Sequence, residues 1–257
     1  MLVDVHCHLN DGRLIEEAPS IVADFEKDGI AAAVSASYDR ESAEIGAELA
    51  ALYEKVYATA GIHPHDARFA CPSDYYRFAE LLSRPKILAV GETGLDYFYD
   101  KSPRDIQGKV FREHLELARA VGKPVVLHIR DAYSDALKIL EDARGCLKNG
   151  VLMHCYGGGA DAVKDFSRFD CFYSFGGAIT FNNGAENRAG LAAVPRDRLL
   201  LETDCPYMTP VPFRGKLNYP KYIALVAKKA AEILNISSEE IEELTLKNSG
   251  TFYGVKF

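Results

Sequence analysis

The chain has 257 residues, of which 48% are hydrophobic and 26% are charged, and this ordinary globular composition excludes an intrinsically disordered protein. The formal net charge of −7 at pH 7 excludes a generally basic nucleic-acid coat, so any basic surface must be local. No apolar run approaches the ~20 residues of a membrane span, and the first residues lack a secretory signal. We therefore expect a cytoplasmic protein without membrane association, and no obligate protein partner is evident.

Short apolar segments alternate with helical patterns along the whole chain. Strands are predicted at residues 3–8, 30–37, 56–62, 86–90, 124–129, 150–153, 171–175 and 198–201. Helices are predicted at 17–28, 40–54, 73–83, 102–121 and 133–143, in a shorter stretch before the seventh strand, and at 219–234 and 238–248.

Eight strands that alternate with helices predict an α/β fold with a parallel sheet, closed as a (β/α)₈ TIM barrel of about 250 residues. An open doubly wound sheet is the alternative fold. No linker, charge block or low-complexity run divides the chain, so we expect residues 1–257 to form one domain.

The first predicted strand carries the run Asp4-Val5-His6-Cys7-His8. If this run is regularly extended, Asp4, His6 and His8 share one face, and Val5 and Cys7 share the other. Imidazole and carboxylate groups on one face suit zinc, manganese and related divalent ions. The simpler interpretation is an N-terminal strand with two half-buried histidines.

The six cysteines are scattered without a CxxC pair, which favours reduced thiols over a disulfide framework or a zinc ribbon. Cys7, Cys155 and Cys205 lie beside candidate ligands. Because neighbours on a strand point to opposite faces, we interpret these three as small buried hydrophobic residues.

Polar residues gather at the ends of the predicted strands, which is the face where such barrels place their chemistry. They are His6, His8, His63, His65, Glu92, His128, His154 and Asp204. Six of the seven histidines obey this rule, and chance placement explains that less well than a functional site does. The exception is His114, in the middle of a predicted helix, which we interpret as an ordinary helix-face residue.

These residues fit a pair of divalent ions that share one carboxylate. The first ion would be bound by His6, His8, Asp204 and Glu92, and the second by Glu92, His128 and His154. Two ions about 3.5–4 Å apart can generate a hydroxide near neutral pH and clamp both oxygens of a phosphodiester. Asp204 can also accept the proton of the attacking water. A single-ion site stays open, and Asp4 is expected to support a histidine instead of binding an ion.

Several motifs resemble the TatD family of metal-dependent deoxyribonucleases, which are amidohydrolase-like barrels. They are Asp4-x-His6-x-His8, Gly61-x-His63-Pro64-His65, Gly91-Glu92-x-Gly94-Leu95-Asp96, His128-x-Arg130, His154-Cys155, Glu202-Thr203-Asp204-x-Pro206 and Arg214-Gly215-Lys216-x-Asn218. The resemblance implies a barrel that cleaves DNA phosphodiester bonds, often as an exonuclease on single-stranded ends, with two ions of magnesium, manganese or zinc.

The resemblance also assigns roles to residues of this chain. The implied metal ligands are His6, His8, Glu92, His128, His154 and Asp204, with Asp204 and Glu92 at the catalytic centre. The implied substrate contacts are His63 and His65, which would bind phosphate, and the cation Arg130. Arg214 and Lys216 lie just after the eighth predicted strand, where they can bind phosphate at the catalytic rim or equally be solvated loop residues.

Four aromatic residues, Tyr97, Phe98, Tyr99 and Tyr156, follow strand ends and can stack unpaired bases, although we expect at least two of them to pack. The chain departs from the family pattern at Asn10, at His114 and at Tyr156, which three glycines follow. None of these is a predicted ligand, so the departures bear on substrate preference more than on chemistry.

Two other functions stay open. A hydrolase of an amide, lactone or aminoacyl ester can use the same centre, because a fold does not fix a function. The third possibility is a non-catalytic, metal-stabilised scaffold. The pair His63 and His65, and the glutamate instead of a lysine on the fourth strand, favour the phosphodiester.

Overall fold

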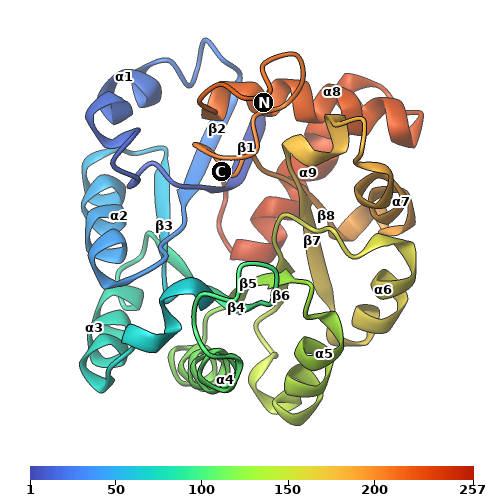
Figure 1. The fold of residues 1–257 in the computed structure, drawn as a ribbon. Coiled ribbons are helices and arrows are strands. Elements are labelled where there is room, and N and C mark those ends of the chain that lie inside the picture. The colour runs from blue at the N-terminus through green and yellow to red at the C-terminus, as the bar shows by residue number, and fades with distance from the viewer.

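Eight parallel strands form a barrel in which each strand pairs with the next one along the chain (Figure 1). A computed structural model describes residues 1–257. The strands are β1 (Leu2–Cys7), β2 (Ile30–Ser35), β3 (Val56–Ala60), β4 (Ile87–Asp96), β5 (Val125–Arg130), β6 (Val151–Met153), β7 (Cys171–Phe175) and β8 (Leu199–Leu201).

The last strand returns to the first just beyond their ends. The backbone N–H of His8 donates to the carbonyl of Cys205 at 2.7 Å, and that of Asp204 donates to the carbonyl of His6 at 3.0 Å. The strand order is sequential and lacks the reversal that defines a doubly wound sheet. The predicted (β/α)₈ barrel is therefore confirmed, and the alternative fold is wrong.

Helices surround the barrel on its outside (Figure 1). They are α1 (Ala18–Ala23), α2 (Arg40–Leu52), α3 (Pro72–Leu82), α4 (Arg104–Val121), α5 (Tyr133–Asp142), α6 (Gly159–Phe166), α7 (Ala185–Ala193), α8 (Ile223–Leu234) and α9 (Ser238–Tyr253). Ser237 and Glu240 form a capping box at the start of α9, and Gly122, with a φ of 68°, ends α4. None of the helices is both long enough and apolar enough to span a bilayer.

Several element predictions differ from the structure. The first helix is shorter than residues 17–28, because the chain leaves α1 early, buries Phe25 and turns into β2 through Gly29 at a φ of 73°. The helix α7 was not predicted, because it buries only Gly190 and Leu191 and so has little apolar periodicity. Strand β4 is longer than predicted, because its last residues continue to pair with β5 as far as Asp96.

The barrel interior is filled by one cluster of apolar side chains. Residues of seven strands contact one another there, which is possible only inside the barrel. Phe252 and Tyr253 at the end of α9 join this cluster, and the hydroxyl of Tyr253 donates to the carbonyl of Val5 at 2.8 Å. The helix α9 therefore helps to complete the core of the barrel.

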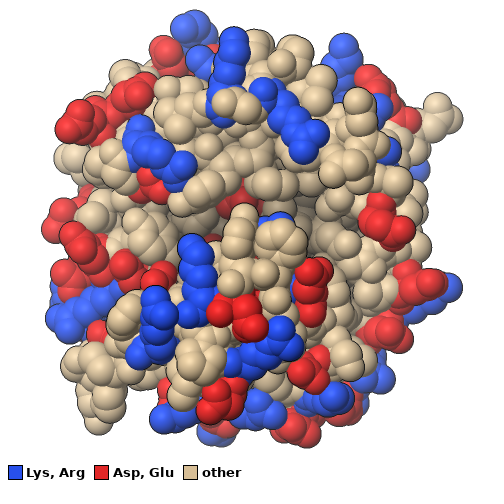
Figure 2. All heavy atoms as spheres, viewed as in Figure 1, with Lys and Arg blue, Asp and Glu red and all other residues tan.

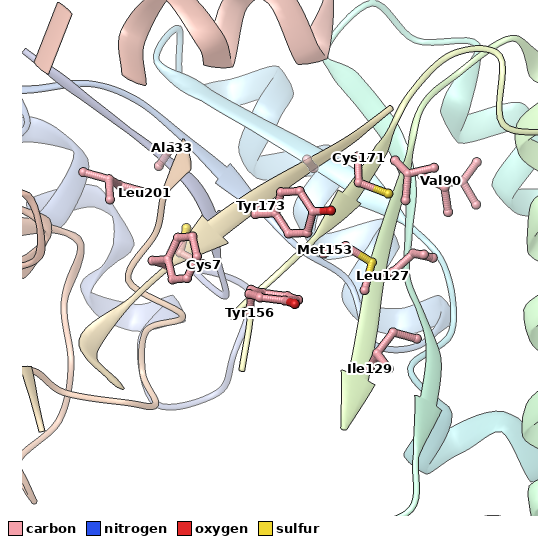
Figure 3. Close-up of a cluster of buried hydrophobic side chains, with 14 of the residues drawn as sticks. Cys7, Ala33, Val90, Leu127, Ile129, Met153, Tyr156, Cys171, Tyr173 and Leu201 are labelled. Atoms are coloured by element: carbon pink, nitrogen blue, oxygen red, sulfur yellow. The ribbon is translucent and has the colours of Figure 1, made fainter. Parts of the chain in front are cut away.

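A larger apolar layer joins the outward faces of the strands to the helices. Figure 3 shows part of it, with Leu127, Ile129, Met153, Tyr156 and Tyr173 among the labelled side chains. Leu127 and Ile129 flank His128, and Met153 precedes His154. Because side chains alternate along a strand, this outward packing turns the two histidines toward the barrel axis.

Candidate active site

The carboxylate of Glu92, on β4, lies at the centre of a cluster of buried histidines. Its Oε1 atom is 2.8 Å from Nε2 of His154, 3.0 Å from Nδ1 of His128 and 3.5 Å from Nε2 of His63. The side chain of Glu92 is only 3% exposed. One oxygen of the carboxylate thus faces imidazoles from the ends of β3, β5 and β6.

The other oxygen of Glu92 faces the ends of β1 and β8. Its Oε2 atom is 3.2 Å from Nε2 of His6 and 3.7 Å from Nε2 of His8. Asp204 completes this side, with Oδ1 at 3.2 Å from Nε2 of His8. The six predicted ligands therefore meet in one place, divided into the two predicted sets by the two oxygens of Glu92.

A close approach of two glycines brings β3 and β4 together below this cluster. A Cβ atom on Gly61 would lie 2.7 Å from the Cα of Gly91. The hydroxyl of Ser37 donates to the carbonyl of Gly91 at 3.1 Å and accepts the N–H of Gly61 at 2.8 Å. Only glycines allow this packing, which places His63 beside Glu92.

The first strand is irregular, and the predicted alternation along it is wrong. The pairing of β1 with β2 shifts register between Asp4 and Cys7, which marks a bulge. Asp4 accordingly lies on the side of Cys7, while Val5 joins the barrel interior. The extra residue lets His6 point inward directly after Val5.

Asp4 does not hold a histidine, contrary to the prediction. Its carboxylate accepts the backbone N–H of Thr203 at 2.9 Å and also the hydroxyl of that residue. Burial raises the pKa of Asp4 to about 8. Asp4 therefore ties β1 to the segment that carries Asp204, and it acts on the site only through the backbone.

In His8 and His128, the ring nitrogen that faces away from the cluster (the outer nitrogen) already donates a hydrogen bond. This bond determines the protonation of the ring nitrogen that faces the cluster (the inner nitrogen). Nδ1 of His8 donates to the carbonyl of Ala36 at 3.0 Å, and Nε2 of His128 donates to Oδ2 of Asp96 at 3.0 Å. In a neutral imidazole, each inner nitrogen then presents a lone pair to the carboxylates. Histidines that bind metals are oriented in this way by a partner on their other nitrogen.

The ring nitrogens of His6 and His154 also suit a bound cation. Neither ring nitrogen of His6 makes a hydrogen bond, although the side chain is buried. His6 stacks on His154 with ring centroids 3.9 Å apart, and Nε2 of His154 lies 3.2 Å from Nδ1 of His128. Buried ring nitrogens without hydrogen-bond partners are costly in a protein interior. Divalent cations would satisfy them, and the imidazole and carboxylate donors suit such ions.

The charges in the cluster depend on one another. Burial opposes the ionisation of Glu92, yet His154, His63 and His6 hold the pKa of this carboxyl well below its usual value. Burial likewise opposes a charge on His8, but Asp204 and Glu92 raise the pKa of His8. A proton and a metal ion therefore compete for the same nitrogen.

Two carboxylates that support the cluster were not predicted individually. Asp96, fully buried, accepts Nε2–H groups from both His128 and His65, the latter at 3.1 Å. Glu202, also fully buried, lies 3.5 Å from Nδ1 of His154. Their places in the sequence were the available signal, since Asp96 ends the run that begins at Glu92 and Glu202 directly follows β8, two residues before Asp204.

His114 lies on the buried face of α4 and outside the candidate ligands, as expected of a helix-face residue, and it has a specific structural role there. It is fully buried on α4, where Nδ1 donates to the carbonyl of Val110 at 2.8 Å and Nε2 accepts the N–H of Ile62 at 3.0 Å. Burial lowers its pKa to about 4, so the ring is neutral near pH 7. His114 thereby fixes the backbone next to His63.

The predicted substrate contacts lie in different places. His63 is inside the cluster, and His65 is bound to Asp96, with 20% of its side chain exposed. Arg130 is exposed at the end of β5, beside aromatic rings of the β4–α4 loop. Arg214 is exposed after β8 and packs over the ring of Phe181 at 4.1 Å, with no contact to the cluster.

The surface is hollowed near the middle of the face shown in Figure 2. Among the four carboxylates of the site, Asp204 is the most exposed, with 14% of its side chain accessible, while Glu92, Asp96 and Glu202 are at or near zero. Solvent thus reaches the cluster beside Asp204.

Known proteins with similar sequences and structures provide independent evidence. The family model of the TatD related DNases matches residues 3–254. A Bacillus subtilis protein, the uncharacterized metal-dependent hydrolase YabD, is 37% identical over 255 residues, which are 99% of this chain and 100% of the relative. The uncharacterized metal-dependent hydrolase TatD of Mycobacterium tuberculosis is 31% identical, over 99% of this chain and 98% of its own.

Solved structures agree with these sequence matches. The crystal structure of the TatD homologue YJJV from Escherichia coli superimposes with a TM-score of 0.92 at 27% identity, and the match covers 99% of this chain and 98% of the homologue. A structure from work that engineered organophosphate hydrolysis from a lactonase template has a TM-score of 0.65 at 13% identity, over 98% and 95% of the two chains, and this likeness shows the fold alone.

Proposed function

This chain belongs to the family of TatD related DNases and is a metal-dependent hydrolase, and we propose that it cleaves phosphodiester bonds of DNA, as an exonuclease on single-stranded ends. Family membership confirms the resemblance seen in the motifs. The proposal extends from the class of enzyme to the bond and the substrate.

One observation carries the proposal: the two oxygens of Glu92 face two separate sets of metal-binding groups. Oε2 faces His6 and His8, and Oε1 faces His128 and His154. These residues would hold two divalent ions of magnesium, manganese or zinc. When bound, such ions activate water and neutralise the charge of a phosphodiester in its transition state.

The residues of the chain supply orientation and proton transfer. Asp204 is the carboxylate of the cluster that solvent reaches, and it is placed to accept a proton from the attacking water. Burial opposes its ionisation, but contacts with His8 hold the pKa of Asp204 below its usual value. Asp204 is therefore ionised near pH 7 and can act as the base.

Positive groups beside the site favour a phosphodiester over an amide, lactone or aminoacyl ester. Lys101 lies in the β4–α4 loop, Arg68 follows β3 and donates to the carbonyl of Lys101, and Arg130 ends β5; none of the three forms a direct ion pair with a carboxylate. A chain with a net charge of −7 thus keeps cations without a direct ion-pair partner on this side of its hydrolytic centre, which suits a polyanionic substrate.

The test is hydrolysis of end-labelled single- and double-stranded DNA by the purified protein with Mg²⁺, with Mn²⁺ and with a chelator. We expect cleavage only with metal, and a loss of at least about 100-fold in Asp204→Asn, because general-base catalysis contributes about 10²–10⁴-fold. Asp197→Asn is the matched control, since Asp197 is 74% exposed just before β8.

Equal cleavage with metal and with chelator, or full activity of Asp204→Asn, would show that the mechanism is wrong. A parallel panel of amide, lactone and aminoacyl ester substrates separates the alternative. Hydrolysis of that panel with no cleavage of DNA would replace the phosphodiesterase by the second function.

A further inference from the structure

Two neighbouring aromatic side chains stand exposed where β4 leads into α4. Phe98 is 55% exposed and Tyr99 is 54% exposed. The guanidinium carbon of Arg130 lies 4.0 Å from the centroid of the Phe98 ring and 4.9 Å from that of the Tyr99 ring. We call these three residues the aromatic platform.

The other two aromatic candidates of the sequence are not available for a ligand. Tyr156 is 2% exposed and donates its hydroxyl to the carbonyl of Gly159. Tyr97 is half-buried, packs against the core and donates its hydroxyl to Asp135 at 3.1 Å. Packing therefore explains these two, as expected, and leaves Phe98 and Tyr99 unexplained.

The platform is attached to the hydrolytic centre through Asp96. Oδ1 of Asp96 accepts the backbone N–H of Tyr99 at 2.7 Å, while Oδ2 accepts from His128 and His65. The ring of Tyr99 also lies edge-on to His65, with centroids 5.3 Å apart. One buried carboxylate thus fixes the platform relative to a predicted metal ligand.

Two cations without a direct ion-pair partner border the platform. Nζ of Lys101 lies 5.6 Å from the centroid of the Tyr99 ring, and Arg68 donates to the carbonyl of Lys101 at 3.0 Å. Neither cation pairs with a carboxylate, whereas the nearby Arg104 is bound by Asp100. Lys and Arg side chains also appear on the rim of the hollow in Figure 2.

We propose that the aromatic platform binds an unpaired base of a single-stranded DNA end next to the phosphodiester that is cleaved, with the base stacked on one of the two rings, which stand at 89° to each other. This assignment rests on the proposed hydrolysis of DNA and names the part of the substrate that determines specificity. Exposed rings with a stacked guanidinium and free cations match a base and its backbone. A base within a duplex has both faces covered by its neighbours, so the platform selects single strands.

The experiment measures kcat/KM of the Mn²⁺-loaded enzyme on labelled single-stranded oligonucleotides. In a matched set, one abasic residue replaces each of the last two nucleotides at either end. We expect at least one abasic position to lower kcat/KM of the wild type by about 5- to 150-fold, the range for loss of one stacked base. The double variant Phe98→Ala/Tyr99→Ala should cleave intact and abasic strands equally, at the rate of the wild type on the abasic strand.

Tyr76→Ala is the matched control, because Tyr76 is 80% exposed on α3 and contacts no histidine of the site. It should keep the preference of the wild type for intact strands. A wild type that cleaves every abasic strand as fast as the intact one overturns the proposal. So does a double variant that loses the same factor on intact and abasic strands, or a blunt duplex that is cleaved as fast as a single strand.

A second measurement separates this proposal from the proposed function. If the wild type cleaves no DNA, the proposed function fails, and the platform is judged from fluorescence anisotropy of the same oligonucleotides with metal-free protein. Binding of intact strands at least about fivefold more tightly than of fully abasic ones, lost in Phe98→Ala/Tyr99→Ala, supports the platform. Equal affinities for both strands overturn it.

Discussion

Replacement of Asp96 by asparagine should weaken metal binding without unfolding the protein. Asp96 accepts three hydrogen bonds, from Nε2 of His128 at 3.0 Å, Nε2 of His65 at 3.1 Å and the N–H of Tyr99 at 2.7 Å. The amide keeps one acceptor oxygen, which can still bind the backbone. Its NH₂ group would face the two imidazole N–H groups, and two donors cannot bond to each other.

The substitution would change which ring nitrogen of His128 carries the proton. To accept from the new amide, the ring must move its proton from Nε2 to Nδ1, which is the atom that faces Glu92. A protonated Nδ1 cannot bind a metal ion. Changes of this kind behind a metal ligand cost about 10–100-fold in metal affinity, or about 1.4–2.8 kcal/mol.

Calorimetric titration of the metal-free protein with Mn²⁺ measures the effect, with Asp100→Asn as control. Asp100 lies four residues further along and forms an exposed ion pair with Arg104, so its replacement should leave the affinity unchanged. We expect one class of sites in Asp96→Asn to weaken by at least tenfold. An affinity within twofold of the wild type for every site would refute this account of His128.

Three further predictions concern pH, metal removal and the core. Burial lowers the pKa of His114 to about 4 in the folded protein, whereas an unperturbed histidine in the unfolded chain has a pKa of about 6.5. As the pH falls from about 6.5 toward 4, the unfolded chain therefore binds this proton first, and the free energy of unfolding should decrease by about 3 kcal/mol. His114→Gln, which keeps a donor and an acceptor, should flatten that part of the urea-denaturation profile, and parallel profiles would contradict the argument. Chelation should lower the thermal unfolding midpoint of the wild type, because ions that bind only the folded state stabilise it. In Glu92→Gln, chelation should lower the midpoint by less. Equal decreases in the two proteins would count against Glu92 as a ligand. Phe78→Ala removes a fully buried ring and should lower the free energy of unfolding by about 3–5 kcal/mol in denaturant titration. The control Phe69→Ala, at a ring that is 67% exposed, should lower it by less than about 0.5 kcal/mol. A loss below about 1 kcal/mol for Phe78→Ala would be inconsistent with the packing.

The arrangement of the site could be predicted because it depends on a regular property of the fold. Strands of a barrel all end on one face, so polar residues at strand ends meet wherever they lie in the chain. Glu92 and Asp204 are 112 residues apart in sequence, yet both face His8. The grouping of the other five predicted ligands around Glu92 follows from this rule.

Other features depend on individual contacts that periodicity does not encode. The bulge in β1 moved Asp4 to the side of Thr203, although regular alternation placed it with the histidines. Asp96 matters because of His128, which is 32 residues away on another strand. Tyr156 follows the end of a strand, as a residue at the rim of the site would, but its ring packs in the apolar core. Such pairings are decided by packing in three dimensions.

Glu92 as the shared ligand of two ions is the central claim, and anomalous diffraction from crystals soaked in Mn²⁺ tests it most directly. We predict two anomalous peaks, one within bonding distance of Oε2 of Glu92 and the inner nitrogens of His6 and His8, and one beside Oε1 and the inner nitrogens of His128 and His154. Peaks located elsewhere, or no peak in contact with Glu92, would contradict it.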